Sequence, residues 1–208
     1  MTLMQEEEFG RDYALTQIDR QRNPLRKLIK SFYVSRVLKH VNGPAIDLGC
    51  GAGQILERLP PGSMGIEVNP YLVDELTRRG LQAVRAAESQ SGFNLKPVSP
   101  NEFSTLVLSH VLEHFDDAYK VLRALLQDCA DLGITTVIIV VPGENGYRSD
   151  PTHKTFVNMD YLKSHGMLDC AGFRLSHHSY FPGDLKFIGK VFIYHELMLV
   201  YQTGHQRV

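Results

Sequence analysis

A strand-like segment that runs straight into a glycine-rich turn is the feature that most limits how this chain can fold. Residues 45–59 read AIDLGCGAGQILERL, so an apolar segment leads to Gly49, Gly51 and Gly53 and then to a helical pattern. Glycine permits the positive φ values and the close backbone approach that such a turn needs. Because free N–H groups point outward where a helix begins, the turn is suited to binding a polar, nucleotide-like ligand.

The segments on either side of the turn predict strands that alternate with helices. We expect strands at residues 45–48, 64–68, 81–86, 103–109 and 134–141, and helices at residues 54–59, 70–79 and 116–131. Continuous apolar strands separated by helices are typical of a parallel sheet that is covered on both faces. A helical pattern at residues 158–170 and two further strands at 173–181 and 191–201 predict an antiparallel end. The expected fold class is therefore α/β, with a doubly wound, mainly parallel, seven-stranded sheet whose last strand is antiparallel.

The region before the turn predicts helices that lie against the main domain. Residues 24–41, PLRKLIKSFYVSRVLKHV, place apolar side chains on one broad stripe and basic side chains opposite. Pro24, preceded by Asn23, is a typical helix start, so we expect a break there. At 208 residues the chain suits one well-buried domain with small additions. We expect residues 1–42 to form an N-terminal helical extension or lid, and residues 43–208 to form the ligand-binding domain.

Charge and cysteine content limit the classes of partner. The 22 Lys and Arg residues nearly balance the 23 Asp and Glu residues, so no basic excess favours nucleic acid or an anionic membrane. Cys50, Cys129 and Cys170 lie far apart without metal-ligand spacing, as is typical of reduced thiols. The acidic amino terminus lacks the apolar core of a secretory signal. We expect a cytoplasmic protein with a small-molecule partner, no membrane insertion and no nucleic acid; whether it forms a homodimer stays open.

The identity of the ligand is narrowed by two fingerprints that the turn does not match. A dinucleotide turn needs G-x-G-x-x-G/A, but the sixth position is Gln54 counted from Gly49 and Leu56 counted from Gly51. A phosphate-binding P-loop needs Gly-Lys-Ser/Thr, which is also missing from this turn. The chain instead has Glu67, 20 positions after Asp47, at the tip of the next expected strand. An acid there is placed to accept both hydroxyls of a ribose.

Asp47 to Gly53, DLGCGAG, followed by Glu67, resembles the class I S-adenosylmethionine-dependent methyltransferases. Residues 103–117, FSTLVLSHVLEHFDD, and residues 150–173, DPTHKTFVNMDYLKSHGMLDCAGF, resemble later segments of the small-molecule, type 11/12-like branch. Ser104 stands where that family often has Asp. The resemblance implies a Rossmann-like sheet, S-adenosyl-L-methionine as cofactor and S-adenosyl-L-homocysteine as product. It implies that the cofactor is bound by Asp47, Gly49, Cys50, Gly51, Gly53, Glu67, Val68, Ala87, Ser109 and His110.

The reaction that the resemblance implies is O- or N-methylation of a small molecule. His153 lies in the loop after the expected fifth strand, at the edge where open α/β sheets place their ligands. We predict that it faces the acceptor as a general base or hydrogen-bond partner; the alternative is that it braces the turn at Asp150 and Pro151. By resemblance alone, the third segment favours a sugar or envelope polysaccharide precursor as acceptor.

Two other interpretations are weighed against this one. The same fold could serve a non-catalytic S-adenosylmethionine-binding or regulatory protein. The adjacent pair Glu113 and His114 could bind a metal ion, since carboxylate and imidazole are common ligands. Adjacent residues in a helix rarely share one ion, and the sequence offers no evident third ligand, so we expect no metal.

Overall fold

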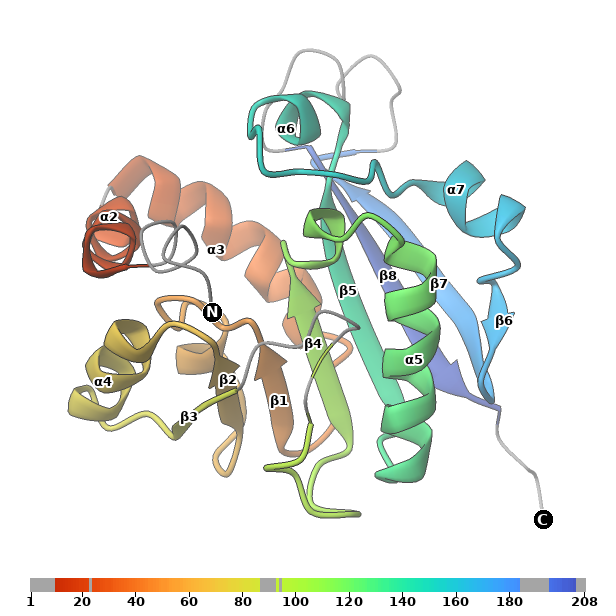
Figure 1. Ribbon diagram of the computed structural model, residues 1–208, viewed down its shortest axis with the longest axis horizontal. Helices are drawn as coiled ribbons and strands as arrows, with labels where there is room; N and C mark the ends of the chain where they lie inside the picture. Colours follow the sequence, from red (N-terminus) through yellow and green to blue (C-terminus); the bar gives the residue numbers. More distant parts are fainter. Residues whose placement is uncertain (1–9, 23, 87–92, 94, 184–194, 205–208) are drawn as a thin grey trace.

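The chain forms one mixed sheet whose strands follow the order β3-β2-β1-β4-β5-β8-β7-β6 (Figure 1). A computed structural model describes residues 10–22, 24–86, 93, 95–183 and 195–204. The parallel strands are β1 (Ala45–Leu48), β2 (Met64–Glu67), β3 (Ala83–Arg85), β4 (Thr105–Ser109) and β5 (Thr136–Pro142). The antiparallel end comprises β6 (Asp169–Cys170), β7 (Phe173–Phe181) and β8 (Glu196–Thr203). β8 lies between β5 and β7 and runs antiparallel to both, which confirms the predicted class of fold.

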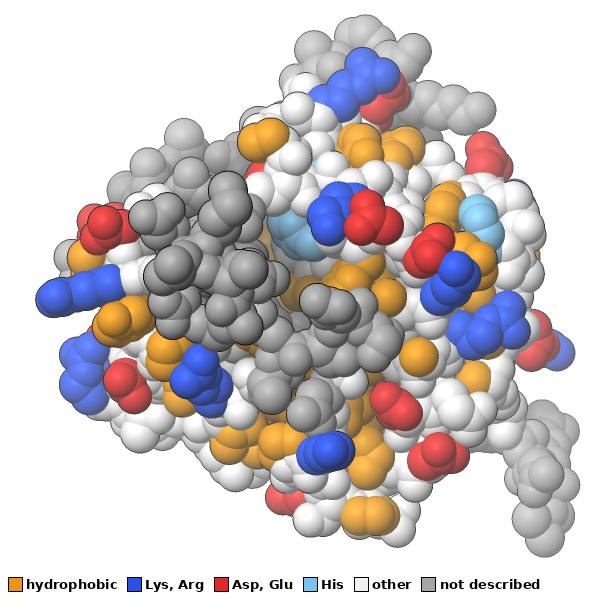
Figure 2. Space-filling model, in the orientation of Figure 1, with side chains coloured by type: hydrophobic (Ala, Val, Ile, Leu, Met, Phe, Trp, Pro, Cys, Tyr) orange, Lys and Arg blue, Asp and Glu red, His pale blue; other side chains and the backbone are white. Residues whose placement is uncertain are grey.

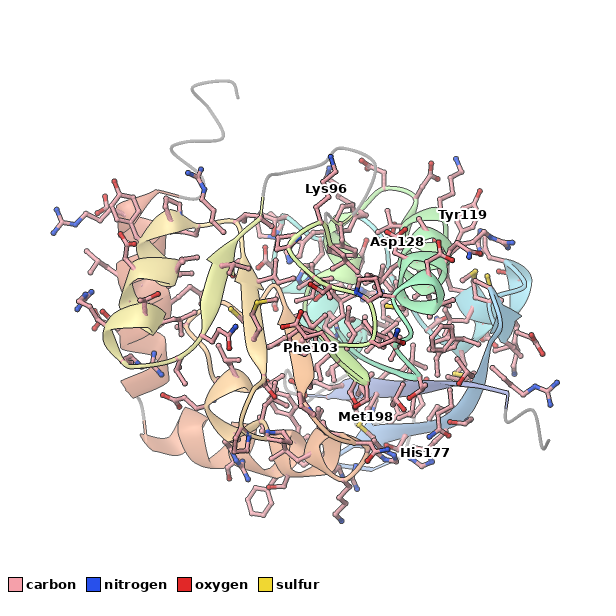
Figure 3. All side chains as sticks on the ribbon, turned by 90° about the horizontal axis from the view of Figure 1, so that it is seen from below. Lys96, Phe103, Tyr119, Asp128, His177 and Met198 are labelled. Atoms are coloured by element: carbon pink, nitrogen blue, oxygen red, sulfur yellow. The ribbon has the colours of Figure 1, made fainter. Side chains whose placement is uncertain are left out.

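Helices cover both faces of this sheet. On one face lies α5 (Ala118–Asp131); on the other lies α3 (Pro24–Leu38). Figure 3 shows the two layers: Tyr119 and Asp128 of α5 lie on one side of the sheet, and Met198 and His177 lie on the α3 side. The remaining helices are α2 (Arg11–Arg22), α4 (Pro70–Arg78), α6 (Glu144–Arg148) and α7 (Met159–Ser164), with 3-10 turns η1 (Leu56–Arg58) and η2 (Leu112–His114).

Alternation along the central strands assigns each residue to one of two cores. Leu106 and Leu108 of β4 point toward α5, whereas Val107 points toward α3. The α5 core continues through the apolar face of that helix, and the α3 core contains Tyr33, Val34 and Val37. Because both faces of β1, β4 and β5 are buried, these strands read as continuous apolar runs in the sequence.

Several elements differ from the expected ones, and three of them show a clear physical reason. The sheet has an eighth strand, the two-residue β6, inside the segment predicted as a helix over residues 158–170. That helix is limited to α7, because Gly166 takes a φ of +68° soon after it and turns the chain away. The helix expected at residues 54–59 is only the 3-10 turn η1, since Leu59 precedes Pro60 and is extended.

Within the described residues the amino-terminal region has two helices, and the second begins at Pro24, as predicted; Asn23 itself lies outside the described residues. The sequence pattern places Phe32 on the buried stripe of α3, but this side chain is 58% exposed, whereas its neighbours Tyr33 and Val34 are buried. α2 packs through Ala14 and Ile18 against residues of the glycine turn and α4. Among the described helices, none has the length and apolar character that crossing a lipid bilayer requires.

Candidate functional site

The candidate site lies where β1 and β4 end, side by side in the middle of the sheet. From β1 the chain continues outward to β2 and β3, whereas β4 and β5 extend the sheet in the opposite direction. In open α/β sheets, ligands bind at the carboxyl ends of the strands where the strand order reverses in this way. The glycine turn follows β1, and the segment from His110 to His114 follows β4, so the two most distinctive sequence segments meet at this point.

The glycine turn is held by β2 and has positive φ at all three glycines. The backbone N–H groups of Gly49 and Cys50 donate to the Ile66 carbonyl at 2.8 and 3.3 Å. Gly49, Gly51 and Gly53 have φ of +72°, +53° and +83°, values that residues other than glycine rarely adopt. The backbone conformation therefore favours glycine at each of these three positions.

The space around the three glycines differs. A Cβ atom on Gly49 would lie 2.6 Å from Val111, and one on Gly53 would lie 2.3 Å from Leu76. A Cβ atom on Gly51 would have no neighbour within 4 Å among the described residues. Gly49 and Gly53 thus permit close packing of the protein, whereas Gly51 faces open space in which a ligand can approach the backbone.

Glu67 lies at the end of β2 and binds the turn through its carboxylate. Oε2 accepts from the Gly51 N–H at 2.7 Å, and Oε1 accepts from the N–H groups of Val68 and Asn69 at 2.9 and 3.0 Å. Burial raises the pKa of the Glu67 carboxyl, and these three N–H donors oppose the rise because they stabilise the charged form. Three backbone bonds leave free acceptor capacity on the two oxygens.

Asp47 and Cys50 form the buried floor of the turn. The side chain of Asp47 is almost fully buried, and its Oδ2 has no hydrogen-bond partner among the described residues. Burial is the main reason why the pKa of Asp47 is raised to about 7, and the nearby Glu67 carboxylate adds to the rise. Burial likewise raises the pKa of Cys50 well above its ordinary value, so its thiol is neutral. Cys50 is therefore not a nucleophile in its resting form.

Ser109 and His110 lie at the carboxyl end of β4, as the sequence predicts. The Ser109 hydroxyl is buried without a hydrogen-bond partner among the described residues. His110 has a φ of +56°, a left-handed conformation that costs an ordinary residue about 1–2 kcal/mol, while its N–H donates to the Val140 carbonyl at 2.9 Å. Backbone strain of this kind is concentrated at functional sites, where the surrounding structure maintains it.

The imidazole of His110 lies between two carboxylates. Its Nε2 is 3.1 Å from Oε1 of Glu196 on β8, and its Nδ1 is 3.5 Å from Oε1 of Glu113 in η2. Burial alone would lower the pKa of His110, but Glu196 and Glu113 outweigh it and raise the pKa to about 9. Tyr33 of α3 contacts the same ring edge-on at 6.3 Å between centroids. His110 is therefore a cation at neutral pH, held between β4, β8 and α3.

His153 comes from the loop after α6 and lies beside η2. Its Nδ1 is 2.9 Å from the Tyr147 carbonyl, and its ring lies 4.9 Å from the ring of His114. Its Nε2 is 3.8 Å from Oε1 of Glu113, and the side chain is 9% exposed. Figure 2 shows histidine surface in a hollow near the centre of this face, next to a basic and an acidic side chain. His153 thus joins the β4 end of the site, and its Tyr147 bond also gives it a bracing role.

The structure brings most of the predicted site residues into two adjoining groups. The first is the glycine turn with Asp47, Glu67 and Val68; the second is the segment around His110 with His153. Val111, which contacts the Gly49 position, joins the two groups. Ala87 lies outside the described residues.

Two buried carboxylates of the site could not be recognised as site residues from the sequence alone. Glu113 stands there only as half of an adjacent pair with His114, and Glu196 only as a charge within an apolar run. Both are at most 5% exposed in the fold and both contact His110. The sequence does place each acid next to the end of an apolar strand. A carboxylate that is buried there requires a hydrogen-bond or charge partner, and this is the one feature that could have marked both acids.

Comparisons with known proteins agree on the fold and on the central domain. Residues 46–134 match a family model described as "Methyltransferase domain". No curated protein sequence matches the chain. A SAM-dependent methyltransferase from Archaeoglobus fulgidus is similar in structure, with a TM-score of 0.65, 18% identity, and 89% of this chain and 98% of that chain covered.

Two further solved structures show how varied the neighbours are. Magnesium protoporphyrin IX methyltransferase from Synechocystis, solved with bound SAH, has a TM-score of 0.61 and 16% identity, with 93% of this chain and 98% of that chain covered. The [4+2]-cyclase SpnF has a TM-score of 0.55 and 13% identity, with 82% and 79% covered. Residues 46–134 therefore match the methyltransferase domain model, and the fold of the chain is that of the class I S-adenosylmethionine-dependent methyltransferases.

Proposed function

We propose that this protein transfers a methyl group from S-adenosylmethionine to an oxygen or nitrogen atom of a small acceptor. The single observation that carries the proposal is the open space at Gly51, directly beside the buried carboxylate of Glu67. A ligand that enters there can approach the backbone of Gly51 closely on one side and meets a hydroxyl-accepting acid on the other. The neighbours solved with SAM and SAH support the same choice of cofactor.

The residues of the glycine turn fit the cofactor. We propose that Gly49, Cys50, Gly51 and Gly53 hold its methionine part, and that the unpartnered Oδ2 of Asp47 serves the same end. Glu67 retains acceptor capacity for the ribose hydroxyls after its three backbone bonds. Val68, Ala87, Ser109 and His110 complete the proposed set, with the buried Ser109 hydroxyl and the cationic His110 nearest the reacting end.

The chain's own task in such a reaction is to align the acceptor and exclude water. When bound, S-adenosylmethionine supplies a methyl group on a positively charged sulfur, which an acceptor lone pair displaces in line. We propose that His153 faces the acceptor, where its Nε2 can accept a proton from a hydroxyl or a methylated amine. The contacts that α2 makes with Ala52 and Leu72 support a role for this helix as a lid over the glycine turn.

The class of acceptor is proposed from charge and from resemblance. A formal net charge of −1 offers no general attraction for nucleic acid, so a small molecule is favoured. Within that class we propose a hydroxylated substrate such as a sugar or envelope polysaccharide precursor. The neighbours act on different molecules according to their names, so this choice rests on residues 150–173 alone.

The alternative to this proposal is a role other than methyl transfer on the same fold. The SpnF neighbour, named as a [4+2]-cyclase, has the same fold. A methyltransferase-like chain can therefore serve another role, and a non-catalytic cofactor-binding protein is the alternative here.

The experiment that separates the two is a methyl-transfer assay with isotopically labelled S-adenosylmethionine across a panel of phenols, sugars and amines. We expect the labelled methyl group to appear in at least one small acceptor, with one molecule of S-adenosylhomocysteine formed for each methyl group transferred. Binding of S-adenosylmethionine without transfer to any acceptor would favour the non-catalytic role. Replacement His153→Gln should lower turnover while cofactor affinity stays unchanged; unchanged turnover would remove His153 from the reaction.

A further inference from the structure

Three side chains that could bind a metal ion come together near the end of β4. Glu113 and His114 belong to η2, and His153 reaches them from the loop after α6. One ligand atom from each of the three lies within 4.8 Å of the others. Ligands of one ion at about 2.1 Å lie roughly 3–4 Å apart, so only a small closure separates this arrangement from a metal site. His153 could not be predicted as the third ligand from the sequence, because it lies in a loop far along the chain from the other two.

The hydrogen bonds of His153 leave one ring nitrogen free to bind an ion. Its Nδ1 lies 2.9 Å from the Tyr147 carbonyl, which can only accept, so Nδ1 carries the proton. When the ring is neutral, Nε2 therefore carries a lone pair; it lies 3.8 Å from Oε1 of Glu113, too far for a hydrogen bond. A metal-binding histidine usually has this arrangement, with its other N–H held by a carbonyl or carboxylate.

His114 is held in the same way. Its Nδ1 lies 3.3 Å from the Thr152 carbonyl and 3.1 Å from the Thr152 hydroxyl. That hydroxyl donates its own proton to Asp150 at 2.6 Å, so it offers only lone pairs to the ring. Nδ1 of His114 is therefore the donor, and Nε2 is left as a lone pair. Both histidines therefore have Nδ1 held by a backbone carbonyl, and one ligand atom of each ring lies within 4.8 Å of the Glu113 carboxylate.

Glu113 is the residue that most requires a partner. Its side chain is 1% exposed, and neither carboxylate oxygen has a hydrogen-bond partner among the described residues. Nearby charge comes from His110, at 3.5 Å, but that imidazole lies closer to Glu196. Two buried carboxyl groups therefore share one imidazole, and Glu113 is the one that lies farther from it. Buried carboxylates without hydrogen bonds are rare unless a cation pairs with them.

We propose that Glu113, His114 and His153 bind a divalent transition-metal ion, with Zn²⁺ as the representative ion. Two imidazoles and one carboxylate form a ligand set that suits zinc, iron or manganese better than magnesium, which favours oxygen ligands. Three protein ligands leave at least one coordination position for another molecule. His114 and His153 are partly exposed, so an ion can reach the site from solvent.

The place of the cluster suggests what an ion would do. η2 begins directly after Val111, the residue that packs against the Gly49 position of the turn. An ion there would lie beside the methyl donor and could bind an acceptor hydroxyl at its open position, lowering the pKa of that hydroxyl. His153 would then act as a ligand and not as a base. Only this role rests on the proposed function; metal binding itself does not.

The test uses the full chain, freed of metal with a chelator, without S-adenosylmethionine or acceptor. Calorimetric titration with Zn²⁺ should show one ion per chain, and an equal concentration of Mg²⁺ should not displace it. Replacements His114→Gln and His153→Gln should each weaken binding at least tenfold, because each removes a ligand. The matched control, His178→Gln on an exposed position of β7, should bind as the unaltered chain does.

Two outcomes would overturn the proposal. One is the absence of Zn²⁺ binding to the unaltered chain; the other is His114→Gln binding Zn²⁺ as tightly as the unaltered chain. His114→Gln decides the matter even if the more buried His153→Gln fails to fold, because His114 is half-buried on a short 3-10 turn. Since no methyl transfer is measured, failure here leaves the proposed function intact, and failure of methyl transfer leaves the metal site intact.

Discussion

At the residue scale, the three glycines of the turn serve two different purposes. All three have the positive φ that the turn needs, but of the three only the Gly51 position has open space beside it among the described residues. The Gly49 and Gly53 positions are filled by Val111 and Leu76, so those glycines serve packing. The sequence indicates a ligand turn through its spacing, but it cannot show which glycine faces the ligand, because that depends on side chains that follow β4 or belong to α4.

Replacing Gly51 or Gly53 by Ala should therefore separate ligand binding from stability. Gly51→Ala adds backbone strain of about 1–2 kcal/mol and places a methyl group in the open space, so cofactor affinity should fall in a folded protein. Gly53→Ala adds the same strain and a clash with the fully buried Leu76, so stability should fall by a further 1–3 kcal/mol or so. Urea unfolding and calorimetric titration measure the two effects. Equal losses of stability in both variants would contradict this division.

Asp47 predicts a pH dependence of stability with a defined sign. Its pKa is about 7 in the folded chain and about 3.9 in an unfolded one, so between these values the folded chain holds a proton that the unfolded chain releases. Its contribution to stability is therefore full below pH 4 and is lost as pH rises through 7. Asp47→Asn should be more stable than the unaltered chain at pH 8, by about 1–3 kcal/mol, and similar to it near pH 4. Urea unfolding at the two pH values measures this; a difference independent of pH would contradict it.

The second group of site residues could be predicted only in part. His110 follows an apolar strand and His153 follows another, so their approach to one edge of the sheet is foreseeable from topology. The role of Glu113 depends on burial, which the sequence LEHF does not reveal. Glu196 reaches His110 only because β8 pairs antiparallel with β5, and that pairing depends on long-range register.

At the element scale, the proposed role of α2 as a lid over the glycine turn can be tested directly. It contributes Ala14 to a small cluster with Ala52 of the turn and Leu72 of α4, and Asn69 donates to the Gly10 carbonyl at 3.4 Å. These contacts involve few apolar atoms, so α2 can move away from the turn at modest cost. That is the behaviour expected of a lid.

A pair of neighbouring substitutions in α2 tests this role. Ala14→Asp places a charge in the buried contact with Ala52 and should lower cofactor affinity about tenfold while the sheet stays folded. Leu15→Asp is the matched control, because Leu15 is 48% exposed on the same helix and should change nothing. Calorimetric titration gives the affinities and far-ultraviolet circular dichroism gives the fold. Equal affinity in both variants would show that α2 does not cover the bound cofactor.

The elements themselves could be predicted to different degrees. Strands β1, β2, β4 and β5 are continuous apolar runs, so their positions are evident in the sequence, as are those of α4 and α5 with their amphipathic patterns. α6 escapes prediction because five residues are too few to show a helical period. The helix predicted over residues 158–170 is too long because its apolar pattern continues beyond Gly166, where backbone conformation ends it.

At the scale of the whole molecule, α3 belongs to the core of the sheet. Val34 and Val37 pack with Val107 of β4 and with Ile138 and Val140 of β5. A division at residue 42, as expected from the change in sequence pattern, separates this helix from the face that it covers. The change in sequence pattern at residue 42 marks a change in the type of secondary structure. It does not by itself mark the edge of an independently folding unit.

Truncation tests which boundary is the physical one. A chain that begins at residue 24 keeps α3 and should remain folded, in the oligomeric state of the full chain. A chain that begins at residue 43 exposes the apolar face of β4, β5 and β8, and should aggregate or lose its cooperative unfolding transition. Size-exclusion chromatography and thermal unfolding measure both; a folded, soluble 43–208 fragment would restore the division at residue 42.

The most direct test of the central claim is a calorimetric titration of the full chain with S-adenosylmethionine and S-adenosylhomocysteine. We expect one molecule of either per chain, with binding weakened at least tenfold by Glu67→Gln, about 1.4 kcal/mol or more. The control Glu102→Gln, an exposed acid before the amino end of β4, should bind as the unaltered chain does. Absence of binding to the unaltered chain, or equal binding by Glu67→Gln, would contradict the proposed site.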